Sequence, residues 1–402
     1  MGDGWGERAG RIVAGYGRVL RDAGRMKTTL LERYARPKLG EPYAPPWKDV
    51  RATVDRFHPE RVVVRVIERR METPDVVTLR LEPDAGPFPP FLAGQYVNVH
   101  VEIGDVRTSR PYSISSPPGR LDGIEITLRV RPDGFVSPFL ADPALVGKTL
   151  EVSGPAGEFH YVPLRDTNDL VMLAAGSGVT PFAAMVEDAL ASDLQIRMTL
   201  LYGARYERDI IFQKRLERLA RSDHRFRLAL TLTRATDAWM GERGRISGEM
   251  VRRHLAHEGV EGKTWLLCGP GMLYREMLLA LGELAVPRHR IRYEPYGPPD
   301  DPTGETGWPV DVDRERKFTL RVEPAGRSIE VSASEPLLNA LDRAGVEVPA
   351  LCRTNVCNAC RTRLVSGSVY TPPDVEDRRP EHNDGFIRPC MAYPVSDVVL
   401  ER

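Results

Sequence analysis

The 402-residue chain has little cysteine, no net charge and no long apolar run, and each shortage excludes a class of protein. Its 56 basic residues balance 56 acidic ones, which argues against a nucleic-acid-binding protein. No run of about 18 apolar residues occurs, so we expect no membrane-spanning helix. The N-terminus lacks the uninterrupted apolar segment and the cleavage site of a secretory signal. With only five cysteines, the chain is expected to be cytoplasmic.

Four of the five cysteines lie near the C-terminus in one spacing. Cys352, Cys357 and Cys360 form a C-x4-C-x2-C pattern, and Cys390 follows later in the chain. This is the plant-type pattern for a [2Fe–2S] cluster, whose four ligands are thiolates. Structural zinc sites prefer two C-x2-C pairs, and the chain has one. Zinc and disulfides remain as alternatives to the cluster.

The first 40 residues predict a basic amphipathic helix. Apolar residues from Ile12 to Tyr34 recur at steps of three and four, and nine Arg and Lys residues accompany them. Such a helix can pack on its own protein or lie on an anionic membrane surface. Glycines within the segment weaken the helix prediction, and prolines follow it. Peripheral membrane contact through residues 1–40 is therefore a hypothesis.

The rest of the chain divides by pattern into three domains after a helical extension and linker at 1–57. Residues 58–166 contain short β-branched runs split by Gly and Pro, which are typical of an antiparallel β-barrel. Residues 167–297 alternate apolar strands with helices, which predicts an α/β domain with a parallel sheet. Residues 298–314 are rich in proline and glycine and suggest a linker. Residues 315–402 combine strands, one helix and the cysteine pattern in an α+β domain.

A cluster of polar and aromatic residues that suits a flavin follows one of the barrel strands. Arg110 can pair with a pyrophosphate, Tyr112 can stack on an isoalloxazine ring, and Ser113 can bond to its N5 atom. Alone, an arginine near a tyrosine carries little information.

A second segment of the same domain can hold a phosphate. Gly134, Val136 and Ser137 can offer backbone N–H groups and a hydroxyl to the anion. An ordinary turn is the alternative, because Pro132 and Asp133 precede Gly134.

Two glycine-containing segments follow apolar strands of the α/β domain. Gly176 and Gly178 let a diphosphate approach a helix N-terminus, which Thr180 can cap and Pro181 can begin. A tight turn without a ligand is the alternative. The second segment is Cys268-Gly269-Pro270, at the sheet edge where such folds place ligands. For Cys268 alone, a buried small hydrophobic residue is the alternative.

Taken in order, these motifs resemble the ferredoxin–NADP reductase superfamily over roughly residues 60–402, in the branch with a C-terminal plant-type ferredoxin. The resemblance implies a β-grasp-like ferredoxin domain and an activity as the reductase component of an oxygenase, hydroxylase or desaturase. It assigns flavin binding to Arg110, Tyr112 and Ser113. The Gly134-x-x-Ser137 element implies FAD rather than FMN.

The same resemblance assigns the nucleotide and nicotinamide sites. The glycine-rich loop maps to Gly176, Gly178, Thr180 and Pro181, and the segment near the nicotinamide maps to Cys268, Gly269 and Pro270. Glu294 resembles the acidic residue near the flavin. We expect Ser113, Cys268 and Glu294 to set the hydride geometry.

Coenzyme choice depends on the segment that starts at Tyr202, which is similar to the part of the family that holds the adenosine ribose. Arg205 and Arg208 can meet a 2′-phosphate, which favours NADPH slightly over NADH. Arginines at these positions can equally be solvated charges.

The chain departs from the family at two places. Asn355 and Asn358 replace the usual glycines of the cluster loop, and asparagine tolerates positive φ better than most residues. Their amides can change hydrogen bonding to the sulfurs and hence the reduction potential. The N-terminal extension has no counterpart in the family core.

We therefore expect an NAD(P)H-dependent oxidoreductase that carries FAD and a [2Fe–2S] cluster and passes electrons to a protein partner. One alternative is a self-contained reductase of ferric iron, a quinone or oxygen. Another is a redox sensor whose cluster switches binding to a partner protein. The full set of nucleotide motifs favours an enzyme, because a sensor needs only the cluster.

Overall fold

Alternating apolar residues build the first β-sheet of the chain. The computed structural model describes residues 61–119, 122–299, 301–372 and 385–401, so the helix expected in residues 1–40 lies outside it. In the first strand, Val64 and Val66 are fully buried, whereas Arg65 between them is exposed. This period of two is what a strand with one face on a core requires.

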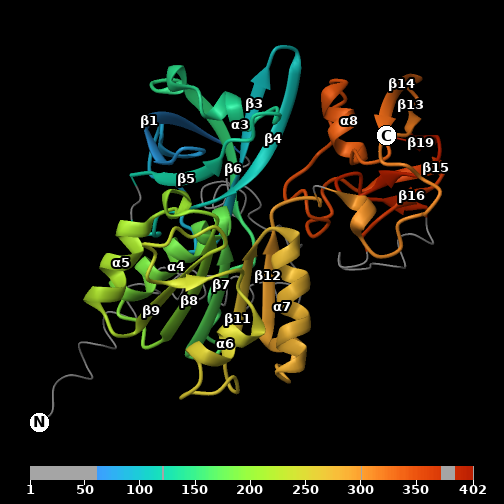
Figure 1. The fold of residues 1–402 in the computed structure, drawn as a ribbon. Helices are drawn as coiled ribbons and strands as arrows, with labels where there is room; N and C mark the ends of the chain where they lie inside the picture. Colours follow the sequence, from blue (N-terminus) through green and yellow to red (C-terminus); the bar gives the residue numbers. More distant parts are fainter. Residues whose placement is uncertain (1–60, 120–121, 300, 373–384, 402) are drawn as a thin grey trace, which may run out of the picture. The chain divides into compact units, whose positions relative to one another are not determined.

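Six antiparallel strands form this sheet, in the order β4-β3-β6-β1-β2-β5 (Figure 1). The strands are β1 (Val62–Thr73), β2 (Val76–Pro83), β3 (Tyr96–Ile103), β4 (Val106–Ser113), β5 (Ile124–Arg129) and β6 (Thr149–Ala156). A bridge between Ile114 and Ile126 joins the two outer strands of the order. The sheet thereby closes on itself, which is the antiparallel barrel expected from the sequence. The short helix α3 (Ser137–Leu140) and the 3-10 turn η2 (Pro143–Leu145) follow β5.

A parallel sheet follows, in the order β10-β9-β8-β7-β11-β12. Its strands are β7 (Asp169–Ala175), β8 (Arg197–Ala204), β9 (Phe226–Leu232), β10 (Glu242–Arg243), β11 (Thr264–Gly269) and β12 (Ile291–Pro295). The helices between them are α4 (Thr180–Ala191), α5 (Gln213–Ser222), α6 (Gly248–His254) and α7 (Gly271–Glu283). The 3-10 turns of this part are η3 (Gly176–Val179), η4 (Glu207–Asp209) and η5 (Arg288–Arg290).

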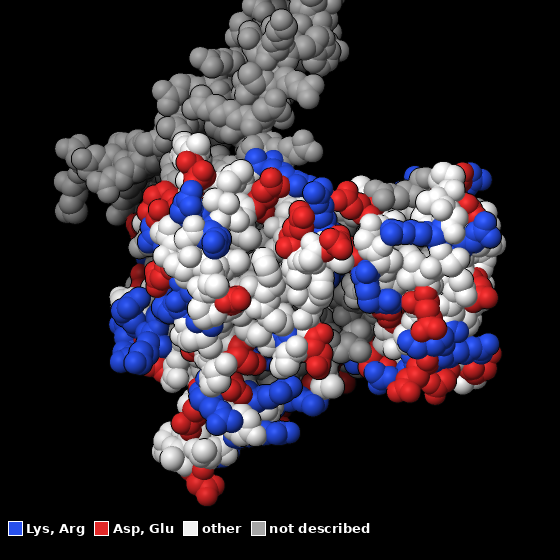
Figure 2. Space-filling view, turned by 90° about the horizontal axis from the view of Figure 1, so that it is seen from above, with Lys and Arg blue, Asp and Glu red and all other residues white. Residues whose placement is uncertain are grey.

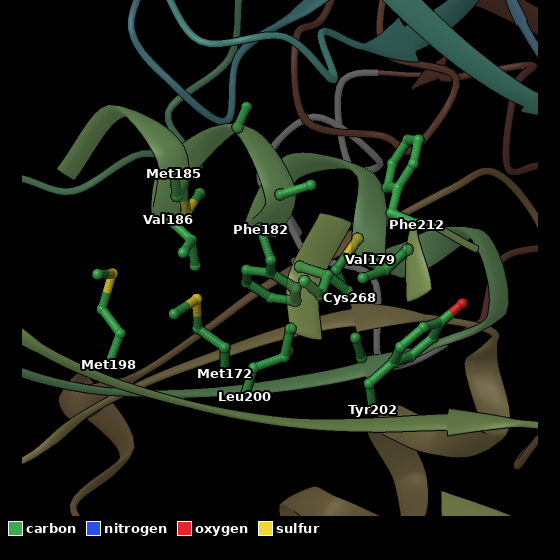
Figure 3. Packing of buried hydrophobic residues seen from close by; sticks show 14 of the residues in the cluster. Met172, Val179, Phe182, Met185, Val186, Met198, Leu200, Tyr202, Phe212 and Cys268 are labelled. Carbon is green, nitrogen blue, oxygen red and sulfur yellow. The ribbon is translucent and has the colours of Figure 1, made fainter. Parts of the chain in front are cut away.

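Both faces of the parallel sheet are buried, because successive residues of its central strand point to opposite cores. Met172 of β7 packs with Phe182 of α4, as Figure 3 shows. Its neighbour Leu173 packs in the second core with Met250 of α6 and Met277 of α7. Each side chain buried in this way contributes about 1.5–3 kcal/mol. Helices on both faces of a parallel sheet confirm the expected α/β architecture.

The C-terminal sheet has the order β14-β13-β19-β15-β17. Its strands are β13 (Lys317–Glu323), β14 (Arg327–Ser332), β15 (Thr362–Ser366), β17 (Phe386–Ile387) and β19 (Val398–Glu401), and α8 (Leu337–Arg343) packs on it. The strands β16 (Val369–Tyr370) and β18 (Tyr393–Pro394) form a separate pair. This α+β arrangement agrees with the expected ferredoxin-type domain.

The segment that the sequence suggested as a linker contains residues of the C-terminal core. It includes the 3-10 turn η6 (Pro302–Gly304). The Trp308 ring lies 5.1 Å from the Tyr370 ring and 6.3 Å from the Tyr393 ring, centroid to centroid. Its indole N–H donates to the carbonyl of Val312, which is itself buried in that core. These contacts attach the segment to the domain that follows it.

Residues 58–402 form one compact unit. Among the helices of the described residues, none is both long and apolar enough to cross a bilayer.

Replacing Trp308 by alanine is expected to destabilise the C-terminal domain by about 2–3 kcal/mol, because a partly buried indole and two aromatic contacts are lost. Thermal melting followed through the visible absorption of the expected iron–sulfur cluster measures this loss. Val310→Ala is the matched control, since Val310 is fully exposed two residues away. Equal melting temperatures for the two variants would contradict a role for Trp308 in this core.

Candidate functional site

The residues expected to bind the flavin lie on strand β4 itself, not after a strand as the sequence suggested. β3 pairs with the whole of β4, with Tyr96 opposite Ser113 and Val99 opposite Arg110. Tyr112 packs against the barrel core, and this burial raises the pKa of its hydroxyl to about 12. Arg110, Tyr112 and Ser113 therefore share one rigid element.

The guanidinium of Arg110 is held by three acceptors. Its Nη1 donates to Thr108 Oγ1 at 2.7 Å, to the Ser109 carbonyl at 2.8 Å and to Asp342 at 3.3 Å. Burial is the main cause that lowers the pKa of Arg110 to about 10, and the charge of Arg353 adds to it. The side chain keeps its charge at neutral pH and can pair with a phosphate.

The predicted phosphate segment forms a turn before α3. The amide of Gly134 donates to the carbonyl of Arg131, and the hydroxyl of Ser137 accepts from the Arg131 amide at 3.0 Å. Val136 is buried in the barrel core. The turn that the sequence left as an alternative is thus present, and the Ser137 hydroxyl contributes to it.

Close packing explains one glycine of the nucleotide loop. A Cβ atom on Gly178 would lie 2.0 Å from the carbonyl oxygen of Cys268, so only glycine fits between η3 and β11. Gly176 adopts a φ of 55°. Pro181 lies in the first turn of α4, as expected.

Thr180 does not cap α4 as the sequence suggested. The 3-10 turn η3 leads directly into the helix, and Val179 is its cap residue. The Thr180 hydroxyl instead donates to the carbonyl of Ser177 at 2.9 Å. It also lies 2.9 Å from the hydroxyl of Tyr296.

Tyr296 is a site residue that the sequence reasoning did not single out. Its hydroxyl lies 3.1 Å from Ser113 Oγ, in addition to its contact with Thr180. The same hydroxyl is a hydrogen-bond partner of the Cys268 thiol. One phenol thus connects the barrel strand β4, the nucleotide loop and β11. Its position two residues after Glu294 was the signal in the sequence that could have identified Tyr296 as a site residue.

Cys268 and Glu294 lie side by side on β11 and β12. Cys268 is fully buried, and its sulfur lies 3.5 Å from the Glu294 carbonyl. Burial raises the pKa of the Cys268 thiol, and the Glu294 charge adds to this. Tyr274, which the sequence reasoning also missed, donates to the Glu294 carbonyl at 2.6 Å and accepts from the Gly269 amide. Pro270 is the cap residue of α7.

The Glu294 carboxyl group is in an environment that favours its neutral form. Burial raises its pKa to about 8, against the opposing charge of Arg292. Its Oε2 atom is buried and has no hydrogen-bond partner among the described residues. An orphaned oxygen of this kind fits a polar group of a bound flavin or nicotinamide, because burial without a partner costs free energy.

Two arginine side chains lie against Tyr206 after the end of β8, and Arg205 precedes Tyr206 in the chain. Arg205 and Arg208 are exposed, and the Arg208 guanidinium lies 5.0 Å from the centre of the Tyr206 ring. Arg234, which the sequence reasoning missed, donates to the Tyr206 hydroxyl at 3.1 Å. A cationic group of this composition suits a phosphate.

The four cysteines of the C-terminal domain form two pairs. The amide of Cys352 lies 3.5 Å from Cys357 Sγ, and the amide of Cys357 lies 3.3 Å from Cys352 Sγ. The thiols of Cys360 and Cys390 are hydrogen-bond partners. The Cys357 thiol is the main cause that lowers the pKa of Cys352 to about 5, and backbone amides of the loop add to it.

This donor set fits a two-iron cluster better than a single zinc ion. Two pairs of thiols match two irons with two protein ligands each. All five cysteines are free of disulfides.

The two asparagines of the cluster loop adopt the backbone that the sequence suggested. Asn355 has a φ of 68° and Asn358 a φ of 62°. Their side-chain oxygens accept from Arg388, and the Asn355 backbone donates to the Cys390 thiol. The amides therefore cross-link the loop to the segment that carries the fourth cysteine.

Family models match all three domains. An oxidoreductase FAD-binding domain matches residues 64–161, an oxidoreductase NAD-binding domain matches 172–278, and a 2Fe-2S iron-sulfur cluster binding domain matches 320–395.

Curated relatives cover the same three domains. NADH oxidoreductase HCR of Escherichia coli is 30% identical over 82% of this chain and 94% of its own length. The glycine betaine monooxygenase reductase subunit of Chromohalobacter salexigens is 27% identical over 84% of this chain and 94% of its own. The 3-ketosteroid-9-alpha-monooxygenase ferredoxin reductase component of Mycobacterium tuberculosis is 29% identical over 86% of this chain and 92% of its own length.

Among solved structures, phthalate dioxygenase reductase shares the fold, with a TM-score of 0.62 at 23% identity over 85% of this chain and 98% of that one. The chain belongs to the ferredoxin–NADP reductase superfamily, in the branch with a C-terminal plant-type ferredoxin domain. It is an oxidoreductase that uses FAD, a [2Fe–2S] cluster and a nicotinamide coenzyme.

The raised pKa of Glu294 predicts a pH-dependent stability. The folded protein holds a proton on Glu294 that the unfolded chain releases above about pH 4.5. The contribution of Glu294 to the free energy of unfolding is therefore complete below that pH and is lost as pH rises through about 8. The free energy of unfolding should therefore fall by up to about 1.4 kcal/mol per pH unit in this window because of Glu294.

Urea unfolding of wild type and Glu294→Gln between pH 5 and 8 isolates this effect, since glutamine mimics the neutral acid. The difference between the two proteins should change steadily with pH. Glu102→Gln, at a carboxylate with 61% side-chain exposure, is the control and should follow wild type. Parallel profiles for wild type and Glu294→Gln would show that Glu294 is ionised in the folded state.

Proposed function

We propose that the protein takes a hydride from NAD(P)H and delivers the two electrons, one at a time, to a separate oxygenase, hydroxylase or desaturase. The observation that carries this proposal is the position of the cysteine loop. The side chain of Arg353, next to Cys352, donates to the Ser109 carbonyl of strand β4 at 2.9 Å. The loop expected to hold the cluster therefore contacts the strand expected to hold the flavin.

We assign the chemistry between coenzyme and flavin to a small set of side chains. Bound FAD accepts a hydride and releases single electrons. Ser113 offers a buried hydroxyl from a rigid strand, and the buried Cys268 thiol shares its hydrogen-bond partner, the Tyr296 hydroxyl. Glu294 holds a proton near neutral pH. Arg110 supplies positive charge for the pyrophosphate.

The identity of the acceptor follows from the relatives. Two of those described above are named as reductase components of monooxygenases, acting on glycine betaine and on 3-ketosteroids. An oxygenase is therefore the partner we propose, and this partner determines which final substrate is oxidised.

On the face drawn in Figure 2, basic and acidic side chains are interspersed, in keeping with the balanced composition.

The relative NADH oxidoreductase HCR supports a second candidate, because its name specifies no oxygenase. In this case the protein would reduce ferric iron, a quinone or oxygen by itself. Turnover of such an acceptor directly at the flavin would not need the cluster. A Cys390→Ser variant, which lacks one proposed cluster ligand, would then keep full turnover.

We propose NADPH as the preferred coenzyme. Arg208 and Arg234 flank Tyr206, and Arg205 lies beside it in the chain, so the group offers three cations to a 2′-phosphate. NADH lacks this phosphate and would gain nothing from these charges.

An anaerobic titration with NADPH and then NADH, followed by visible absorption and low-temperature EPR, tests these proposals together. We expect both flavin and cluster bands to bleach, a reduced [2Fe–2S] signal, and one electron more than the flavin alone accepts. NADPH should act at the lower concentration. Flavin bleaching without an iron signal would contradict the electron-transfer function.

The basic N-terminal segment leads us to propose peripheral membrane contact, with a membrane-bound or membrane-adjacent acceptor. A protein lacking residues 1–57 should lose binding to liposomes that contain anionic lipid, because clustered Lys and Arg bind such surfaces. Co-sedimentation measures this, with neutral liposomes as the control. Undiminished binding by the shortened protein would exclude the segment as an anchor.

A further inference from the structure

A buried ion pair of the C-terminal domain lies against strand β4 of the barrel. Arg353 donates to Asp342 at 2.6 Å, and their side chains are only 7% and 8% exposed. The Asp342 carboxylate also accepts from the hydroxyl of Thr108 on β4 at 3.0 Å. Arg353 Nη2 donates to the same Thr108 hydroxyl at 3.0 Å.

Uncharged groups of β3 and β4 extend this contact between the barrel and the C-terminal domain. The amide side chain of Asn98 on β3 donates to the Ala350 carbonyl at 3.0 Å, and the Ser109 hydroxyl donates to it at 3.3 Å. Both side chains are buried. The residues come from positions more than 230 apart in the chain, so their geometry depends on how the two domains meet.

Such a contact is selective for one geometry. A buried charge is costly unless its partner and its hydrogen bonds are all in place, and removing one partner leaves an uncompensated charge. Arg353 has acceptors on its own domain, at Asp342, and on the barrel, at Thr108 and the Ser109 carbonyl. Its guanidinium is therefore fully compensated when the cluster loop lies against β4.

We propose that Asp342, Arg353 and Thr108 form a polar latch that positions the cluster loop against the flavin-binding strand for electron transfer. In the step that the latch serves, one electron passes from reduced FAD to the [2Fe–2S] cluster, so FAD is oxidised and the cluster is reduced by one electron each. The latch residues supply no proton and form no bond to either group. They are positioning residues, and their substitution should slow this step.

The latch also touches the flavin-binding residues. Arg110 donates to the Asp342 carboxylate, so one acid lies between the arginine expected to hold the pyrophosphate and the arginine of the cluster loop. In the absence of Asp342, the buried guanidinium of Arg353 and the partly buried guanidinium of Arg110 would lie near each other without this counter-ion. The carboxylate therefore allows both cations to occupy this interface.

Stopped-flow reduction of the fully loaded protein by NADPH tests the latch, because flavin and cluster absorb at different wavelengths. Asp342→Asn removes the charge and keeps the shape. Thr108→Val removes the hydroxyl contacts with Asp342, Arg353 and Arg110 from the barrel side, away from the cysteines. Thr108 and Asp342 also accept from Arg110, so each variant is compared with wild type at full FAD content. Once the flavin has been bleached, we expect cluster reduction to be at least tenfold slower than in wild type. The midpoint potentials and the integrated EPR signal should stay unchanged.

Glu335→Gln is the matched control, because Glu335 pairs with Arg343 of α8 and has no part in the latch. Its cluster should be reduced at the wild-type rate. Wild-type rates of cluster reduction in both Asp342→Asn and Thr108→Val would overturn the latch. Slower cluster reduction explained by a shifted potential would also overturn it, in favour of an electrostatic effect on the cluster.

This inference rests on the proposed function, and the same experiment separates the two. If the wild-type cluster is not reduced through the flavin, the proposed function fails. If the wild-type cluster is reduced and both variants match it, only the latch fails.

Discussion

The register of three parallel strands is the constraint on which the nucleotide site depends. Cys268 of β11 pairs with Ala174 of β7 on one side and with Glu294 of β12 on the other. Because parallel strands end at the same edge, the glycine loop after β7, the thiol and the carboxyl group meet there. A shift of one residue in either pair would turn these side chains to the opposite face. The packing of the two cores, which fixes the register, thus determines where the site forms.

Much of this arrangement could be predicted from the sequence, because its signals are local. The cysteine spacing, the glycine loop and the alternation of strands and helices each reflect the geometry of a few neighbouring residues. They indicated the three domain types and placed Cys268 at the sheet edge, whereas Glu294 was identified through the family resemblance. The exact extent of β4 was less visible, since Arg110 and Pro111 are unusual within a strand.

The contacts that escaped prediction join residues far apart in the chain. Tyr296 reaches Ser113 and Thr180, and no pattern around Tyr296 specifies those partners. Arg234 approaches Tyr206 only because β8 and β9 are neighbours in the sheet. The asparagines of the cluster loop are the contrasting case, since their backbone conformation is a local property of the residue type. Their side chains bind Arg388, and this partner could be recognised only from the fold.

The contact of Trp308 with Tyr370 and Tyr393 has a consequence for how such modular proteins can be recombined. A fusion boundary placed at residue 315, where the strand pattern begins, would leave this indole on the wrong side of the junction. The transplanted ferredoxin module would then carry two tyrosines without their aromatic neighbour, and also lack Val312. A boundary before the turn at Pro302–Gly304 keeps these residues with their module. The natural unit of exchange is thus longer than the sheet and helix alone indicate.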